Sequence, residues 1–382
     1  MNNRSRSGIP ALTGMRFIAA LMVFVSHYPV PGLGGAFKRI ADSGYIGVTF
    51  FFILSGFVIG YNYLDAFEKH TRGHTISYVI ARFARVYPLY LFCTLFVWLS
   101  TGAKASFLMY AFALQAWSPD FYTAFGLDGP AWSISVEAFL YLSFPLLVVL
   151  FRALGALSNP RRLLVVALAV VLAIAGLALY FTLTGRGALS PANPASAHRW
   201  LYRTPLTRVF DFALGILAAT WYSRFSAHIS DQGRRGWTLA VYGAIVLMVS
   251  MAAWKPLFFS AFSWDAAYAV PFIVVIVGTS VRQESGFSKA LSTPVMILLG
   301  EASFAFYLIH LVLGSMYSQA PEGLTKLAFY AAFLIFVTVV SVGLHVGIEK
   351  PCRDLIKRLI PVRQKKGIAH APGADDPIRT AG

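Results

Sequence analysis

Ten apolar stretches of roughly bilayer-spanning length follow one another along this chain and restrict what it can fold into. A helix needs about 20 apolar residues to cross the hydrocarbon core of a bilayer. Of the 382 residues, 57% are hydrophobic and 13% are charged, and the mean hydropathy is +0.65, so soluble cores could not bury this much apolar surface. The predicted spans are residues 12–28, 45–64, 84–101, 132–151, 163–184, 206–222, 237–254, 264–281, 294–317 and 325–347.

This pattern predicts an all-α polytopic membrane protein, a bundle of about ten transmembrane helices. The apolar run 107–117 is too short to cross, so we interpret it as one short re-entrant or buried helix. The transmembrane domain is expected over residues 11–350. A cytoplasmic segment, residues 1–10, precedes it, and residues 351–382 form a basic and then disordered cytoplasmic tail.

The distribution of positive charge indicates a membrane topology. A net charge of +16 would suit a nucleic-acid-binding protein, but lysine and arginine concentrate at alternate ends of the predicted spans. This bias predicts that both termini are cytoplasmic, and we expect membrane lipids as partners and no nucleic acid. Cys93 falls in a span and Cys352 in the basic tail, so the sequence supports neither a disulfide framework nor a thiolate metal cluster.

Two basic residues lie on one stripe of the first predicted span. Arg16 and His27 are eleven residues apart, about three helical turns or roughly 16 Å along the axis. Ionisable groups inside a membrane are costly and normally face a bundle interior or a wet cavity. The pair could anchor a charged group near one face and place an imidazole near the other. The alternative is that Arg16 snorkels to the inner surface and His27 caps the outer end.

A second basic pair lies at the inner end of the third span. Arg82 and Arg85 are spaced i, i+3 and therefore share a helix face. Two guanidinium groups on one face can bind phosphate bidentately. They could also be ordinary positive charges that anchor the inner end of a span.

The fourth span carries an acidic group within the membrane. Ser133, Glu137 and Tyr141 repeat at four-residue spacing and share a face. A carboxylate there needs a partner, and His27 or an intramembrane arginine is a candidate. A purely structural ion pair is the other interpretation.

Polar residues recur in the ninth span. Ser303, Tyr307 and His310 fall on one stripe at i, i+4, i+7. Two histidines and a carboxylate suggest zinc, but ligands from three separate spans lack a local metal-binding spacing, so we expect no metal. Arg208 and Asp211, at i and i+3, are expected to form a structural pair inside the bundle.

Five sequence fragments in this order resemble the acyltransferase 3 family of integral-membrane O-acyltransferases. The fragments are Arg16 with ten residues before His27, the run 47–57, the Arg82/Arg85 pair before Val86-Tyr87-Pro88, Trp132 to Glu137, and Ser303 through Tyr307 to His310. The resemblance covers about residues 10–350. It implies an acyl-CoA, usually acetyl-CoA, as co-substrate rather than a bound cofactor, and a sugar hydroxyl of a surface glycan as acceptor.

The resemblance also implies roles for individual residues. His27 corresponds to the catalytic histidine of the family, Arg16 to the arginine paired with it, and Arg82 and Arg85 to the donor-binding pair. Many relatives have an acidic residue where this chain has Thr49, so a role given to that acid cannot be transferred. We add Glu137 to the predicted catalytic set and assign acceptor-side or supporting roles to Ser133, Ser303, Tyr307 and His310.

These observations predict an O-acyltransferase of the bacterial inner membrane. It would move an acyl group, most simply acetyl, from cytoplasmic acyl-CoA to a hydroxyl of an extracytoplasmic or lipid-linked glycan. A histidine with a pKa near neutrality suits the deprotonation of such a hydroxyl. The alternatives are a transporter or flippase for a lipid-linked sugar or anionic solute, and a non-catalytic membrane subunit of a polysaccharide export complex.

Overall fold

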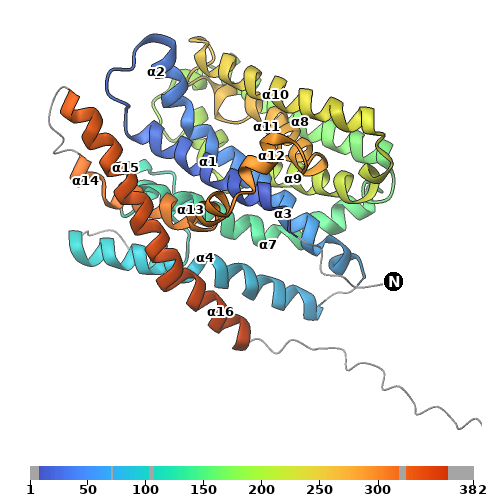
Figure 1. Cartoon of the computed structure of the whole chain (residues 1–382), viewed down its shortest axis with the longest axis horizontal. Helices are drawn as coiled ribbons and strands as arrows, with labels where there is room; N and C mark the ends of the chain where they lie inside the picture. The colour runs from blue at the N-terminus through green and yellow to red at the C-terminus, as the bar shows by residue number, and fades with distance from the viewer. Residues whose placement is uncertain (1–7, 70–71, 103–106, 318–323, 360–382) are drawn as a thin grey trace, which may run out of the picture.

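Helices make up the regular structure of the protein in a computed structural model, which describes residues 8–69, 72–102, 107–317 and 324–359. No strand occurs among these residues. The long helices run side by side and form a bundle (Figure 1). The expected segments 1–10 and 351–382 lie partly outside the described residues.

Ten long helices coincide with the ten predicted spans. They are α1 (Pro10–His27), α3 (Gly47–Lys69), α4 (Arg72–Thr101), α7 (Trp132–Ala153), α8 (Pro160–Leu183), α9 (Pro205–Phe225), α10 (Asp231–Ala253), α11 (Ala266–Val281), α13 (Pro294–Val312) and α15 (Leu324–Leu344). Within the described part of the chain, nine stretches are long and apolar enough to cross a membrane, and they include all of these helices except α9. The prediction of an all-α polytopic membrane protein is therefore confirmed.

Shorter helices connect and extend the long ones. They are α2 (Gly35–Asp42), α5 (Phe107–Ala111), α6 (Phe121–Phe125), α12 (Gly286–Leu291), α14 (Gly314–Tyr317) and α16 (Lys350–Leu359). The run predicted to be short, 107–117, folds as α5 and a 3₁₀ turn, η2 (Gln115–Trp117). Gln115 is buried, and its side-chain amide donates to the carbonyl of Ala131 over 2.7 Å. The segment therefore folds against the start of α7.

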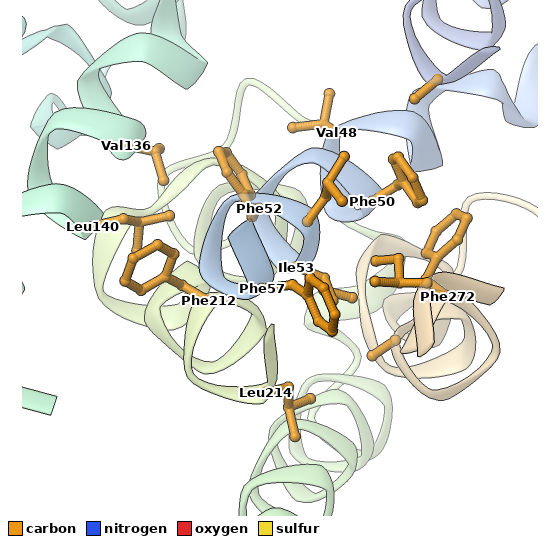
Figure 2. Close-up of a cluster of buried hydrophobic side chains, with 14 of the residues drawn as sticks. Val48, Phe50, Phe52, Ile53, Phe57, Val136, Leu140, Phe212, Leu214 and Phe272 are labelled. Carbon is orange, nitrogen blue, oxygen red and sulfur yellow. The ribbon is translucent and has the colours of Figure 1, made fainter. Parts of the chain in front are cut away.

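Helix α3 occupies the centre of the bundle. Figure 2 shows side chains of α3, among them Phe52 and Phe57, between α7, α9 and α11. Most of this helix is buried, whereas α8 and α10 expose most of their apolar residues at one flank (Figure 1). An exposed apolar surface on a membrane helix is the surface that contacts lipid. The bundle is thus a packed core around α3 with lipid-facing helices outside it.

Glycines bring α3 and α9 into backbone contact. A Cβ atom on Gly56 would lie 2.1 Å from the carbonyl oxygen of Phe212, and one on Gly215 would lie 2.1 Å from that of Ile53. Membrane helices associate through such close packing because lipid provides no hydrophobic drive for helix pairing. A larger residue at either glycine would push these two helices apart.

Arg208 ties α9 to its neighbours through a fully buried ion cluster. Its guanidinium contacts the carboxylates of Asp211 at 2.8 Å and Asp265 at 3.5 Å, and it donates to the Thr49 hydroxyl over 3.1 Å. It also donates to the carbonyl oxygens of Tyr202 and Trp264. The expected Arg208–Asp211 pair is confirmed, and Asp265 is a second acid that its sequence spacing did not indicate.

This cluster generates a stability prediction. We expect Arg208→Leu to destabilise the protein by about 3–5 kcal/mol, because two buried carboxylates lose their shared cation. The loss would appear as a lower melting temperature and a smaller monodisperse peak in size-exclusion chromatography of detergent-purified protein.

The triple variant Arg208→Leu, Asp211→Leu, Asp265→Leu is the control, because it removes the charges together. We expect it to recover much of the lost stability. A single Arg208→Leu variant as stable as the parent would contradict this account of the cluster.

Candidate functional site

Five helices surround a cavity of about 200 Å³. The lining comes from α1, α3, α4, α7 and α13, so segments far apart in the sequence meet here. The cavity collects seven of the nine predicted site residues: Arg16, Arg82, Arg85, Ser133, Glu137, Ser303 and Tyr307. His27 and His310 are not among the lining residues.

Three arginines give the cavity an excess of positive charge. Arg16 comes from α1, and Arg82 and Arg85 from α4, and each is half-buried. Arg82 donates to the Tyr63 hydroxyl over 3.0 Å and lies 5.0 Å from the centroid of the Tyr63 ring. Its Nε atom is buried without a hydrogen-bond partner among the described residues. Three guanidinium groups therefore share this space with one acidic lining residue, Glu137.

The face of α7 enters the cavity as its four-residue spacing predicts. Ser133, Glu137 and Tyr141 all line it. The Tyr141 hydroxyl donates to the Glu137 carboxylate, and the Ser133 hydroxyl donates to the carbonyl of Pro130 over 3.0 Å. Glu137 lines the same cavity as Arg16, and the buried Glu349 outside the lining also acts on Arg16. The structure thus groups Glu137 with the arginines rather than with His27.

The two histidines form a pair at the other end of α1. His27 is the last residue of that helix and is exposed, whereas His310 on α13 is fully buried. Nε2 of His310 lies 3.2 Å from Nδ1 of His27. The Tyr28 hydroxyl donates to the carbonyl of His310 over 2.5 Å and fixes this turn of α13.

Hydrogen bonds to backbone carbonyls indicate which nitrogen of His27 and of His310 carries the proton when each ring is neutral. Nδ1 of His27 is 2.9 Å from the Val23 oxygen, and Nδ1 of His310 is 2.7 Å from the Tyr307 oxygen. A carbonyl oxygen only accepts hydrogen bonds, so each Nδ1 carries the proton. The one Nδ1 proton of His27 is then shared between the Val23 oxygen and Nε2 of His310, and Nε2 of His27 is left unprotonated. This geometry suits a base whose ring is oriented by a second imidazole.

Tyr307 connects the cavity with the histidine pair. Its ring lines the cavity, its hydroxyl donates to Pro130 over 3.2 Å, and its carbonyl accepts from His310. Arg16 and His27 lie at separate places, as their spacing of about 16 Å along α1 requires. The cavity and the exposed imidazole are therefore neighbouring sites rather than one cluster.

The sequence did not single out most of the cavity lining supplied by α3. Ser55 and Asn62 line the cavity from this helix, and their polar side chains in an otherwise apolar span were the signal that could have found them. Phe51 also lines it, and nothing in the sequence separates this phenylalanine from its neighbours Phe50 and Phe52.

Comparisons with known proteins relate nearly the whole bundle to one family. The family model of the acyltransferase 3 domain, described as an acyltransferase domain, matches residues 9–346. The chain is 28% identical to acyltransferase MdmB of Streptomyces mycarofaciens, covering 93% of this chain and 94% of the relative.

Two further relatives are longer than this chain. Peptidoglycan O-acetyltransferase OatA of Listeria monocytogenes is 25% identical over 80% of this chain and 49% of its own length. O-acetyltransferase OatA of Staphylococcus aureus is 22% identical over 94% of this chain and 60% of its own length. No solved structure matches. With the family model extending over nearly all of the bundle, the chain belongs to the acyltransferase 3 family and is a multi-pass membrane acyltransferase.

Proposed function

We propose that this enzyme transfers an acyl group, most simply acetyl, from cytoplasmic acyl-CoA to a hydroxyl of an extracytoplasmic or lipid-linked glycan. The observation that carries the proposal is the cavity with three arginines and one acidic residue beside a histidine pair. The printed names of the OatA relatives, one of them a peptidoglycan O-acetyltransferase, support a glycan acceptor. The family membership favours an enzyme over the transporter or export subunit that the sequence left open.

The charge of the cavity supports an anionic donor. Three cationic groups line the cavity with one carboxylate, that of Glu137, and the buried Glu349 outside the lining also acts on Arg16. Three arginines against two acids leave an excess of positive charge inside an apolar bundle, where such charge is costly unless it is paired. The phosphates of a CoA thioester would supply the missing negative charge, and guanidinium forks bind phosphate bidentately. In this proposal Arg82 and Arg85 hold the donor, which is a co-substrate and leaves with each turnover.

In this proposal Glu137 belongs to the catalytic set and acts beside the bound donor. Its carboxylate accepts from Tyr141 and lines the same cavity as Arg16. A negative group between like charges lowers the cost of bringing the arginines together. Glu137 would therefore orient Arg16 toward the donor. Ser133, Ser303 and Tyr307 would be supporting groups, because their hydroxyls already donate hydrogen bonds to backbone carbonyls.

The histidine pair supports a role in proton transfer. Nε2 of His27 would take the proton of the acceptor hydroxyl while its oxygen attacks the thioester carbonyl. The C–S bond then breaks, and the proton passes from His27 to the departing CoA thiolate. His310 would stabilise the transient imidazolium, because its Nε2 accepts the hydrogen bond from Nδ1 of His27. The exposed ring of His27 would allow the acceptor to approach from the outer face.

The first prediction of this mechanism concerns the two histidines. His27→Ala should lower acetyl transfer by about 100-fold or more, the usual contribution of a general base. His310→Ala should lower kcat by about tenfold with little change in the KM for acetyl-CoA, because it removes the hydrogen bond that orients His27. The measurement is transfer of labelled acetyl from acetyl-CoA to the glycan fraction of membranes that contain the enzyme.

Glutamine at position 310 is the matched control. Its side-chain oxygen can accept from His27, so His310→Gln should restore part of the rate lost in His310→Ala. A correctly folded His27→Ala enzyme with normal activity would remove the histidine from the mechanism.

The second prediction concerns the donor. Arg82→Ala and Arg85→Ala should each weaken acetyl-CoA binding by about tenfold or more, since a charge-assisted phosphate contact is lost. Lysine at either position should rescue binding only in part, because an ammonium group lacks the planar fork. Isothermal titration calorimetry on the purified protein measures this directly.

Arg161→Ala serves as the control for charge alone. Arg161 is exposed at the start of α8 and does not line the cavity. Its loss should leave the Kd of acetyl-CoA unchanged. If the α4 variants behave like this control, Arg82 and Arg85 are topology anchors and not donor ligands.

The third prediction concerns orientation in the membrane. Ser158 and Ser190 are exposed and lie on either side of α8. If both termini are cytoplasmic, a cysteine at Ser158 should react with a membrane-impermeant maleimide only from the cytoplasm, and one at Ser190 only from outside. Both cysteine variants are made in a protein in which Cys93 and Cys352 have been replaced by serine. Cytoplasmic labelling at position 190 would invert the proposed arrangement of donor and acceptor.

A further inference from the structure

An aromatic contact forms part of the cavity wall. Phe51 on α3 and Tyr307 on α13 both line it, and their ring centroids are 6.0 Å apart at an interplanar angle of 67°. This edge-to-face arrangement is a favourable geometry for two aromatic rings. The pair therefore forms a defined wall rather than a loose collection of apolar atoms.

Phe51 also has apolar neighbours outside the cavity. It packs against the main core and against a second apolar cluster, called here the outer cluster, that joins α1, α13 and α15. Its buried members are Ala20, Phe24, Tyr28, Phe306, Ile309, Tyr330, Phe333 and Val337. The rings of Phe24 and Phe306 in turn lie 6.3 and 6.4 Å from that of His310. Phe51 thus touches both the cavity and the cluster that surrounds the buried histidine.

The position of Phe51 and Tyr307 indicates which part of a bound donor would contact their rings. In the proposed function the donor phosphates bind Arg82 and Arg85, and the thioester points toward the histidine pair. The acyl group is then the part of the donor that meets the rings of Phe51 and Tyr307. Aromatic carbon suits an acyl chain and gives no partner to a phosphate.

The two rings differ in how firmly they are held. Tyr307 is tied at its hydroxyl to Pro130 and at its carbonyl to His310, so its displacement would disturb the proposed base. Phe51 has no polar side-chain atom and is held by packing alone. A substitution at Phe51 can therefore change the size of the cavity beside Tyr307, while the hydrogen bonds of His27 and His310 stay in place.

We propose that Phe51 determines the length of the acyl group that the enzyme accepts, because it forms, with Tyr307, the part of the cavity wall next to the histidine pair. This inference rests on the proposed function, because it assumes an acyl-CoA donor in the cavity. A pocket that ends at a fixed wall discriminates between acyl chains by about 10- to 200-fold for each misfitting methylene group. Removing the Phe51 ring would extend the pocket toward the outer cluster.

The test compares acetyl-CoA, butyryl-CoA and hexanoyl-CoA in calorimetric titrations of the purified full-length protein. We expect the parent to bind hexanoyl-CoA at least about tenfold more weakly than acetyl-CoA, which is the lower limit for one misfitting methylene. Phe51→Ala should reduce that ratio to about threefold or less. Phe51→Leu, a milder change, should reduce it in part, and Phe51→Trp should weaken butyryl-CoA relative to acetyl-CoA.

Phe50→Leu is the matched control on the same helix. Phe50 is buried, packs against Phe272 at a centroid distance of 5.3 Å, and does not line the cavity. It should leave the ratio of the two dissociation constants unchanged.

Different outcomes overturn different statements. An unchanged ratio in folded Phe51→Ala and Phe51→Leu, or an equal shift in Phe50→Leu, would overturn the role of Phe51 and leave the proposed function intact. A parent protein that binds none of the three thioesters would overturn the proposed donor and this inference with it.

Discussion

The cost of burying charge in an apolar bundle governs this structure. A guanidinium group inside a membrane protein must find negative charge or hydrogen-bond acceptors. Arg208 finds them within the protein, in two carboxylates, a hydroxyl and two backbone carbonyls, and so it holds helices together. The three arginines of the cavity share a single acidic lining residue. The same side chain thus forms a structural cluster where carboxylates contact it directly, and it lines a cavity with an excess of positive charge where acids are fewer.

The packing of α3 makes that cavity available. Gly56 and Gly215 allow α3 and α9 to meet backbone to backbone, which places one face of α3 in the core. The opposite side of α3 then lines the cavity together with α1, α4, α7 and α13. Close helix contact on one side and open space on the other are consequences of where small and large residues fall along a single helix.

The two parts of the proposed chemistry are adjacent but separate. The positive cavity lies on one side of Tyr307, and the His27–His310 pair lies beyond it. A donor in the cavity and an acceptor at His27 would therefore have to meet beside Tyr307, where the two sites adjoin. Exclusion of water at that place would protect a reactive thioester from hydrolysis.

The sequence predicted the helices and several residues of the cavity lining because both depend on local patterns. Span length follows from hydropathy, and the shared faces of Ser133 with Glu137 and of Ser303 with Tyr307 follow from helical periodicity. All ten predicted spans correspond to helices. The same periodicity placed Arg16 and His27 on one stripe, but it could not show which of them faces a cavity.

Tertiary structure alone decided how these faces combine. The contact of His27 with His310 joins residues 283 positions apart. The grouping of Glu137 with Arg16 instead of His27 depends on where α7 lies along α1, because Arg16 and His27 share one stripe of α1. Asp265 joins Arg208 for the same reason, and Phe51 differs from Phe50 only by the neighbour that it faces. A periodic sequence determines which side chains share a helix face. The packing of helices against one another determines what each face meets, because close approach depends on the shapes of both partners.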